Sequence, residues 1–198
     1  MPISEHTLVP QGKLFIISGP SQVGKDSIVL ALWQTKSLKL THVLTNTTRA
    51  KRPGEQDGVD YNFLTEPEFQ TLIDKDELLE WAIVRGCRFG TPKTHVLQAL
   101  AQGKNVILNI DVQGAKQVLA KLPQATVLIF ITAESPAEVK RRIFASTKMT
   151  LEQKEYRWRE AQTELKAAPT YHHAVVNKLN KLQAAVAEVR DIILKYTA

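Results

Sequence analysis

The sequence is poor in cysteine, with Cys87 the only one among 198 residues, and it has no hydrophobic run long enough to span a membrane. A single cysteine excludes an internal disulfide and a cysteine-rich metal site. The first dozen residues contain Glu5, His6 and Pro10 and lack the apolar core of a signal peptide. We therefore expect a cytoplasmic protein that binds no membrane, folded as one domain with room for a small insertion or lid.

Internal repeats, low-complexity tracts and dense basic runs interleaved with aromatic residues are also missing from the sequence, and such basic runs are typical of nucleic-acid-binding proteins. The formal net charge is +6, which is modest. It is compatible with small polyanionic ligands such as nucleotides and is no more specific than that. We expect no nucleic-acid partner, and either a monomer or a homodimer.

The most informative segment comprises residues 19–27. It follows an apolar run at 14–17 that suits a strand, and it precedes residues 28–32, which suit a helix. This is the context of a phosphate-binding loop, because glycines let backbone N–H groups converge on an anion and the helix N-terminus adds donors. Lys25 would bring a cation to the β and γ phosphates. The candidate phosphate-binding residues are Gly19, Pro20, Ser21, Gln22, Val23, Gly24, Lys25, Asp26 and Ser27.

One position departs from the phosphate-loop pattern. The pattern has Ser or Thr directly after the lysine, as a magnesium ligand, whereas this chain has Asp26 there and Ser27 next. Magnesium accompanying a nucleoside triphosphate would therefore be held by Asp26 or by Ser27. The alternative is a chance Gly-Lys turn before a helix, which the flanking strand and helix disfavour.

The remaining hydrophobic pattern alternates strands with helices, which predicts an α/β fold with a doubly wound parallel sheet of three layers. Residues 42–92 interrupt that alternation with short strands and a long polar, basic loop at 47–63, and we interpret them as an inserted lobe. We expect strands at 14–17, 41–47, 78–85, 88–91, 104–110, 125–131 and 174–177. Helices are expected from the loop to about 36, at 65–75, from 92 to before 103, after 111, from 135, at 150–167 and at 179–196.

With these motifs in place, the chain resembles guanylate kinase, a phosphate-loop enzyme that transfers a phosphoryl group from ATP to GMP. The resemblance covers nearly everything from Leu14 to Ile193. It rests on the loop at 19–25, Thr47-Thr48-Arg49 with Arg52-Pro53-Gly54-Glu55, Gly58 and Asp60-Tyr61, Glu80-Trp81-Ala82, Gly90-Thr91, Ile110-Asp111-Val112-Gln113-Gly114, and Val175-Val176-Asn177.

The resemblance implies three parts and a role for particular residues. The parts are a core (12–41, 93–139 and 168–198), a GMP-binding lobe (about 42–92) and a mobile lid (about 140–167). Residues 19–27 would bind ATP together with Mg²⁺, and Lys25, Arg142 and Arg157 would neutralise the charge of the transferred group. The residues implied for GMP are Thr45, Arg49, Arg52, Tyr61, Glu80, Thr91 and Asp111.

The chemistry of guanine agrees with this assignment. Its pairing edge offers adjacent N1–H and N2–H donors, which one carboxylate accepts together, and Glu80 is the family's residue for that task. Adenine has an acceptor at N1, so Glu80 would reject it. The family implies GMP, and also dGMP, as acceptors. Without the resemblance, Glu80 would be interpreted as a solvated strand carboxylate.

Four positions depart from the family pattern: Asp26, Phe89 in place of a phosphate-binding tyrosine, Asn109 where an acidic residue is common, and Ser146 where a lid arginine is typical, with Lys148 nearby. Two alternatives stay open because of them. One is a guanylate-kinase-like binding module with weak or no catalysis. The other is a kinase of a sugar phosphate such as ribose 1,5-bisphosphate, whose enzymes have a similar Gly-Lys-Asp-Ser segment.

Overall fold

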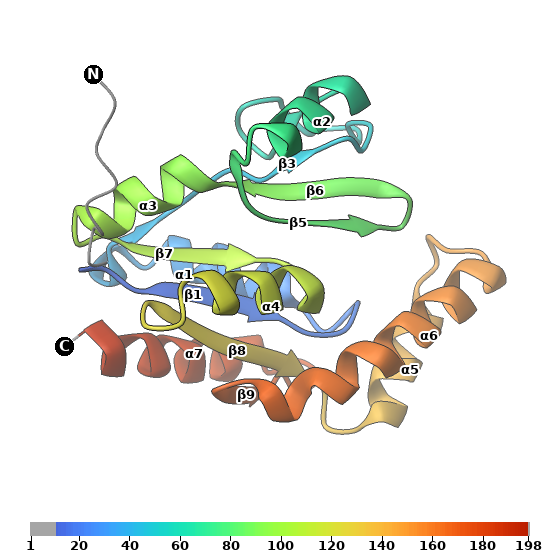
Figure 1. The fold of residues 1–198 in the computed structure, drawn as a ribbon. Coiled ribbons are helices and arrows are strands. Elements are labelled where there is room, and N and C mark those ends of the chain that lie inside the picture. Colours follow the sequence, from blue (N-terminus) through green and yellow to red (C-terminus); the bar gives the residue numbers. More distant parts are fainter. Residues whose placement is uncertain (1–10, 198) are drawn as a thin grey trace, which may run out of the picture.

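The computed structural model describes residues 11–197, so most of the irregular segment expected at 1–12 lies outside the described residues. Its centre is a five-stranded sheet in which all strands are parallel, in the order β2-β7-β1-β8-β9 (Figure 1). The strands are β1 (Leu14–Ser18), β2 (Leu40–Thr41), β7 (Asn105–Asn109), β8 (Thr126–Thr132) and β9 (His173–Val176). This arrangement confirms the predicted doubly wound parallel sheet.

Helices cover both faces of this sheet, as a parallel sheet requires. The helices α1 (Lys25–Trp33) and α7 (Leu182–Thr197) pack on one face, and α3 (Lys93–Ala101) and α4 (Val112–Lys121) pack on the other. Successive residues of β1 point to opposite faces, so the strand supplies both cores and is buried throughout. Because β1 is central, the loop that follows it sits at the middle of the sheet's carboxyl edge.

A second, mixed sheet lies above the first and has the order β4-β3-β6-β5 (Figure 1). Its strands are β3 (Asn46–Thr47), β4 (Asn62–Phe63), β5 (Leu78–Val84) and β6 (Cys87–Pro92). Helix α2 (Glu66–Asp74) precedes β5 and starts, as expected, at residue 65, where a capping box forms: Thr65 and Glu68 cap each other's backbone N–H groups.

The expectation of one strand at 41–47 was wrong. Residues 40–41 form β2 of the core sheet and residues 46–47 form β3 of the second sheet. The segment between them carries the chain from one sheet to the other, and a single continuous strand could not pair in both.

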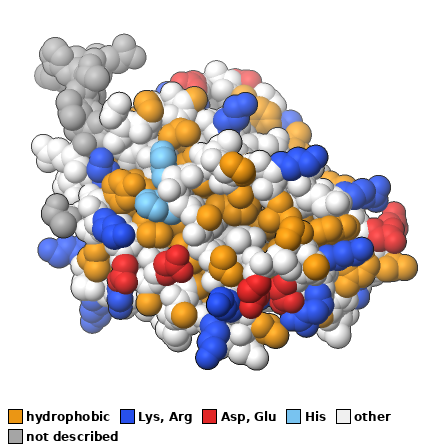
Figure 2. All heavy atoms as spheres, turned by 90° about the horizontal axis from the view of Figure 1, so that it is seen from below, with side chains coloured by type: hydrophobic (Ala, Val, Ile, Leu, Met, Phe, Trp, Pro, Cys, Tyr) orange, Lys and Arg blue, Asp and Glu red, His pale blue; other side chains and the backbone are white. Residues whose placement is uncertain are grey.

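Helices α5 (Pro136–Ala145) and α6 (Leu151–Ala167) pack against each other and project beyond the end of the core sheet (Figure 1). The face formed by α7 and its neighbours carries hydrophobic side chains among charges of both signs (Figure 2). Among the described residues, none of the helices combines the length and hydrophobicity needed to cross a lipid bilayer.

Three predicted helix details were wrong for local reasons. Helix α1 ends at Trp33 because Thr35 leaves helical geometry, and residues 36–38 form a separate 3-10 turn. Helix α7 begins at Leu182, after Asn180 adopts a left-handed backbone with φ 56°. At the start of α5, the spacing of Ser135 and Glu138 predicts a capping box. Ser135 does cap the helix, but the Glu138 side chain pairs with Arg141 and Arg142 and does not return to the N-cap backbone.

Candidate active site

The predicted phosphate loop connects β1 to α1. Gly19 has φ 139°, and a Cβ there would lie 2.0 Å from the Ile131 carbonyl oxygen of the neighbouring strand, so only glycine fits. Gly24 is the N-cap of α1 with φ 89°. The backbone N–H groups of the first turn of α1 therefore point into the loop, where an anion would be stabilised by hydrogen bonds and by the helix dipole.

Lys25 lies in the bend of this loop. Its Nζ donates to the carbonyl oxygens of Gly19 at 2.5 Å and Pro20 at 2.8 Å. Burial lowers the pKa of this ammonium, and the nearby charges of Glu164 and Asp26 act in the opposite direction. The loop thus holds a partly desolvated cation, which interacts more strongly with an anion than a fully hydrated one would.

Asn177, which follows β9, supports the loop from beneath. Its Nδ2 donates to the Val23 carbonyl at 2.8 Å, and its side chain is buried. A Cβ on Gly24 would lie 2.6 Å from the same Nδ2. In the sequence, Asn177 was noted only as part of the Val175-Val176-Asn177 motif. Nothing in a linear sequence indicates that residue 177 contacts residues 23 and 24.

Two of the departures from the family pattern contact each other. Asn109 at the end of β7 donates through Nδ2 to Asp26 Oδ1 at 2.5 Å. The amide occupies one carboxylate oxygen of Asp26 and leaves the second oxygen free of protein hydrogen bonds in the described part of the chain. The sequence shows both departures from the family pattern, but it did not predict the hydrogen bond between the two side chains.

Glu80 is a buried carboxylate on β5, with only 3% of its surface exposed. It accepts a hydrogen bond of 2.6 Å from Thr91 Oγ1 on the adjacent strand β6. Burial raises its pKa to about 7, with the Thr91 hydrogen bond acting against that shift and the charge of Asp111 adding to it. A register shift between Leu78 and Glu80 inserts one residue into β5 and turns Leu79 into the core.

The first turn of α4 lies against this carboxylate. A Cβ on Gly114 would be 2.3 Å from Glu80 Oε2, so the glycine makes room for the acid. Asp111 caps α4 by accepting from the Gly114 N–H at 2.8 Å. The negative charge of Asp111 favours the protonated forms of both Lys25 and Glu80 and so acts to raise the pKa of each.

The basic loop brings Arg49 and Tyr61 together. The Arg49 guanidinium lies 5.3 Å from the centre of the Tyr61 ring and forms two hydrogen bonds with Glu55, of 3.0 Å and 2.8 Å. Burial and the charge of Asp26 raise the pKa of Tyr61, so its hydroxyl stays a donor at neutral pH.

The other two predicted residues of this region make backbone contacts. Arg52 donates its backbone N–H to Glu55, while its side chain is exposed. Thr45, half-buried, accepts from the Asn62 N–H through its carbonyl.

The two predicted lid arginines differ in position. Arg157 on α6 donates from Nη1 to Ser21 Oγ of the phosphate loop at 3.1 Å. Burial and the charge of Arg85 lower its pKa. Arg142 on α5 instead forms ion pairs with Glu138 and Glu134 at 2.7 Å and 3.4 Å, so the structure does not bring it to the loop.

A second contact of α6 reaches the other sheet, because Arg85 after β5 pairs with Glu160 at 3.3 Å. Burial raises the pKa of the carboxyl of Glu164, also on α6, and the charge of Lys25 acts against that shift. Sequence reasoning missed Glu160 and Glu164, since acidic residues on a polar helix carry no motif.

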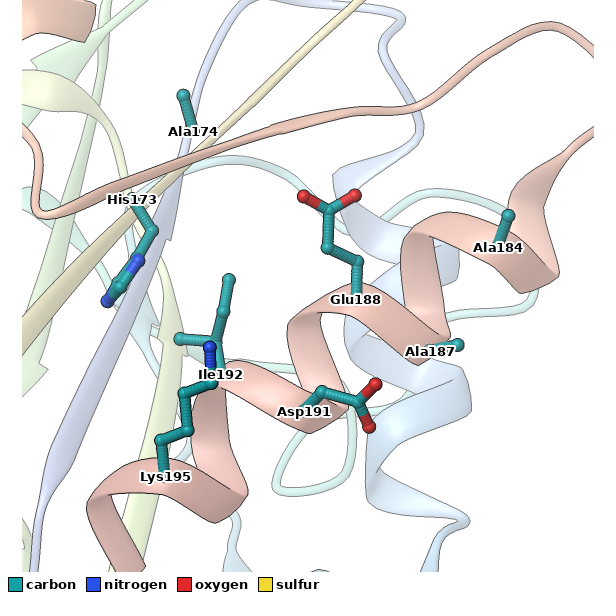
Figure 3. A pocket seen from close by; sticks show the side chains of 8 residues that line it. All are labelled: His173, Ala174, Ala184, Ala187, Glu188, Asp191, Ile192 and Lys195. Atoms are coloured by element: carbon teal, nitrogen blue, oxygen red, sulfur yellow. The ribbon is translucent and has the colours of Figure 1, made fainter.

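The molecule also has a cavity away from these residues. A cavity of about 620 Å³ lies between β9 and α7 and is lined by His173, Ala174, Ala184, Ala187, Glu188, Asp191, Ile192 and Lys195 (Figure 3). None of the predicted site residues contributes to it. The cavity therefore shares no residue with the predicted sites on the loop, the second sheet and α6.

Comparison with known proteins agrees with this geometry. The family model described as guanylate kinase matches residues 11–196. The chain belongs to the guanylate kinase family. It is 40% identical over 183 residues to the guanylate kinase of Enterococcus faecalis, covering 92% of this chain and 88% of that protein.

Two further family members extend the comparison. The rice protein named guanylate kinase 2, chloroplastic/mitochondrial is 38% identical over 184 residues, and the match covers 93% of this chain but 64% of that longer protein. The crystal structure of guanylate kinase from Anaplasma phagocytophilum superimposes with a TM-score of 0.77 at 25% identity, covering 94% of this chain and 86% of that one. The predicted family and fold class are thereby confirmed.

Proposed function

We propose that this chain phosphorylates GMP with ATP, giving GDP and ADP. The observation that carries the proposal is Glu80, a buried carboxylate that accepts a hydrogen bond from Thr91 on the second sheet and for which Gly114 of α4 leaves room. A buried acid that lacks a cationic partner is costly unless a ligand uses it. Guanine supplies N1–H and N2–H to such a carboxylate, and Thr91 orients the acid to receive them.

The acceptor phosphate would bind at the basic loop, through Arg49, Arg52 and Tyr61. Arg49 uses three N–H groups on Glu55 and the Ala50 carbonyl, so two of its five donors are available to a phosphate. Glu55 thus orients the guanidinium. Phe89 packs edge-on against the Tyr61 ring, with 6.1 Å between the ring centres, and supplies no hydroxyl to the phosphate. Thr45 is proposed as a second hydroxyl near the base.

ATP would bind at residues 19–27, with Lys25 at its β and γ phosphates. Phosphoryl transfer needs the two nucleotides in line and the charge of the moving group neutralised. Arg157 would take that role, which its contact with Ser21 of the loop supports, and Arg142 would have to exchange its pairing with Glu138 and Glu134 to join it. Closure of α5 and α6 over the nucleotides would exclude water and suppress ATP hydrolysis.

Magnesium bound with ATP would neutralise phosphate charge. In the described residues, no cluster of three or more His, Cys, Asp or Glu side chains could hold a metal alone. Magnesium is commonly bound by one or two carboxylates and substrate phosphates, which fits the oxygen donors Asp26, Ser27 and Asp111. We propose Asp26 as the main protein ligand, direct or through water, since within residues 11–197 its second oxygen accepts no protein hydrogen bond.

We also propose the three-part division into core, GMP-binding lobe at about 42–92 and lid at about 140–167, a cytoplasmic location, and a monomer or homodimer without nucleic-acid or membrane partners. The binding-module and sugar-phosphate alternatives are not favoured by the family comparisons.

The deciding experiment is phosphoryl transfer from ATP across a panel of GMP, dGMP, AMP, UMP and ribose 1,5-bisphosphate. The proposal expects turnover with GMP and dGMP and essentially none with the others. Normal GMP binding without GDP formation would favour a binding module. Turnover of the bisphosphate without GMP binding would favour the sugar-phosphate kinase.

A further inference from the structure

Strand β5, which carries Glu80, lies at the edge of the second sheet and pairs on one side with β6. Its other side faces α4, which packs against it. An edge strand exposes backbone N–H and C=O groups that need partners when a helix covers them. Polar side chains of α4 can supply those hydrogen-bond partners and so restrain the backbone of β5.

Gln117 on α4 satisfies both backbone groups of Trp81. Its Nε2 donates to the Trp81 carbonyl at 2.7 Å, and its Oε1 accepts from the Trp81 N–H at 3.2 Å. The side-chain amide has the same donor and acceptor pair as a peptide group. Gln117 therefore takes the place of a neighbouring strand at this one position.

Lys121, one helical turn further along α4, holds the residue on the other side of Glu80. Its Nζ donates to the Leu79 carbonyl at 2.7 Å. Leu79 is the residue inserted by the register shift, so its carbonyl lies where the ladder with β6 is interrupted. The backbone is thus fixed immediately before and immediately after Glu80, while Gly114 of the same helix faces the Glu80 carboxylate.

We propose that Gln117 is a positioning residue for guanine recognition, assisted by Lys121. By holding the backbone on both sides of Glu80, the two side chains fix the direction of the carboxylate, so that both oxygens meet the N1–H and N2–H donors of the base. The inference rests on the proposed function, because it assumes that Glu80 binds guanine. Both side chains would act through the β5 backbone that they contact, and neither is assigned a contact with the base or the reacting phosphates.

The test compares GMP with inosine monophosphate, which keeps N1–H but lacks the 2-amino group. Gln117→Met retains the side-chain volume and removes both hydrogen bonds. We expect it to raise KM for GMP on the order of tenfold and to reduce the preference for GMP over inosine monophosphate by a similar factor. KM for ATP should stay within about twofold, since the phosphate loop is untouched.

Lys116→Met is the matched control, because Lys116 is exposed on the same helix. Lys121→Met is the second variant, expected to shift the same preference in the same direction. A structural effect alone would lower Tm and reduce turnover of both acceptors equally, and that result would overturn the proposal. An unchanged preference in both variants would overturn it as well.

Glu80→Gln separates this inference from the proposed function. If Glu80→Gln leaves the preference unchanged, the guanine assignment itself fails. If Glu80→Gln abolishes the preference and Gln117→Met does not change it, only the positioning role fails. In the double variant, Gln117→Met should cause no further loss of preference, because the residue acts through Glu80.

Discussion

At the residue scale, Glu80 has the most consequential environment in the molecule. Burial raises its pKa to about 7, so its charge changes near neutral pH. The ionised form accepts both guanine donors, whereas the protonated form has one oxygen occupied by a proton. We predict that kcat/KM for GMP falls by up to about tenfold per pH unit below about pH 7, and that Glu80→Gln removes this dependence. Initial rates against pH provide the measurement.

The raised pKa of Glu80 also makes the free energy of unfolding depend on pH. The folded pKa lies above the ordinary value of 4.5, so the charged form is disfavoured in the folded protein and the cost of burying it is greatest above about pH 7. Glu80→Gln should therefore increase the free energy of unfolding in alkaline buffer, and the increase should disappear toward pH 4.5. A gain that is constant with pH would contradict the assignment of that pKa to Glu80.

Asp26 and Asn109 provide a second prediction at this scale. We expect Asp26→Ser to raise the magnesium concentration needed for half-maximal rate, and KM for ATP, by several-fold, with KM for GMP little changed. Asn109→Asp would bring two carboxylates together, because the present contact is 2.5 Å. Binding of Mn²⁺-ATP, followed by calorimetry, measures the effect without turnover.

The double variant Asp26→Ser/Asn109→Asp should recover part of the Mn²⁺-ATP affinity that each single variant loses. The binding free energies of the two substitutions should differ from additivity by about 0.5–3 kcal/mol, as is usual for side chains in contact. Additive effects would mean that the pair does not act as a unit. Equal effects on ATP and GMP would contradict the placement of Asp26 at the metal.

At the scale of elements, helix α6 connects the parts of the site, since Arg157 contacts Ser21 and Glu160 contacts Arg85. We predict that Arg157→Met lowers kcat by about 100-fold or more while KM for GMP changes little, because a cation at the transferred group matters most in the transition state. Steady-state kinetics with both substrates varied separate the two parameters.

Arg159→Met on the same helix is the control, because its side chain is exposed. A comparable loss of kcat in that variant would indicate a general effect on α6. An unchanged kcat in Arg157→Met would remove the arginine from the transfer step.

The position of helix α4 could be predicted from the sequence, whereas its hydrogen bonds to β5 could not. Its start after residue 111 follows from the N-cap chemistry of Asp111, and its hydrophobic stripe gives the face that packs on the sheet. The polar side chains that hold β5 leave no periodic signal. They act at a sequence separation of 36 or more residues, as the hydrogen bonds of Gln117 and Lys121 do.

At the scale of the whole molecule, stability depends on the two hydrophobic cores on either side of the central sheet. Ile129 on β8 is fully buried in the core beneath α1 and α7. We predict that Ile129→Ala lowers the free energy of unfolding by about 2–5 kcal/mol through lost burial and a cavity. Urea titration gives the value, and KM for GMP should be unaffected because the second sheet is elsewhere.

Leu194→Ala is the matched control on α7, where the leucine is 44% exposed. This substitution should lower the free energy of unfolding by no more than about 0.5 kcal/mol. Equal losses in the two variants would contradict the assignment of the core.

The sequence by itself determined the features that depend on neighbours along the chain. These are the glycine-bounded loop, the capped helix starts, the alternating strands of the parallel sheet, and the family through its ordered motifs. Local rules of backbone conformation, capping and hydrophobic spacing act within a few residues, so a linear pattern records them.

Only the tertiary structure decided what depends on distant residues meeting. It divided residues 40–47 between two sheets, paired Asp26 with Asn109, buried Glu80 against Gly114, and brought Arg157 but not Arg142 to the loop. Burial sets the pKa of Glu80, and burial is a property of the packed molecule. The residue types were visible in the chain, while their charge states and partners follow from the fold.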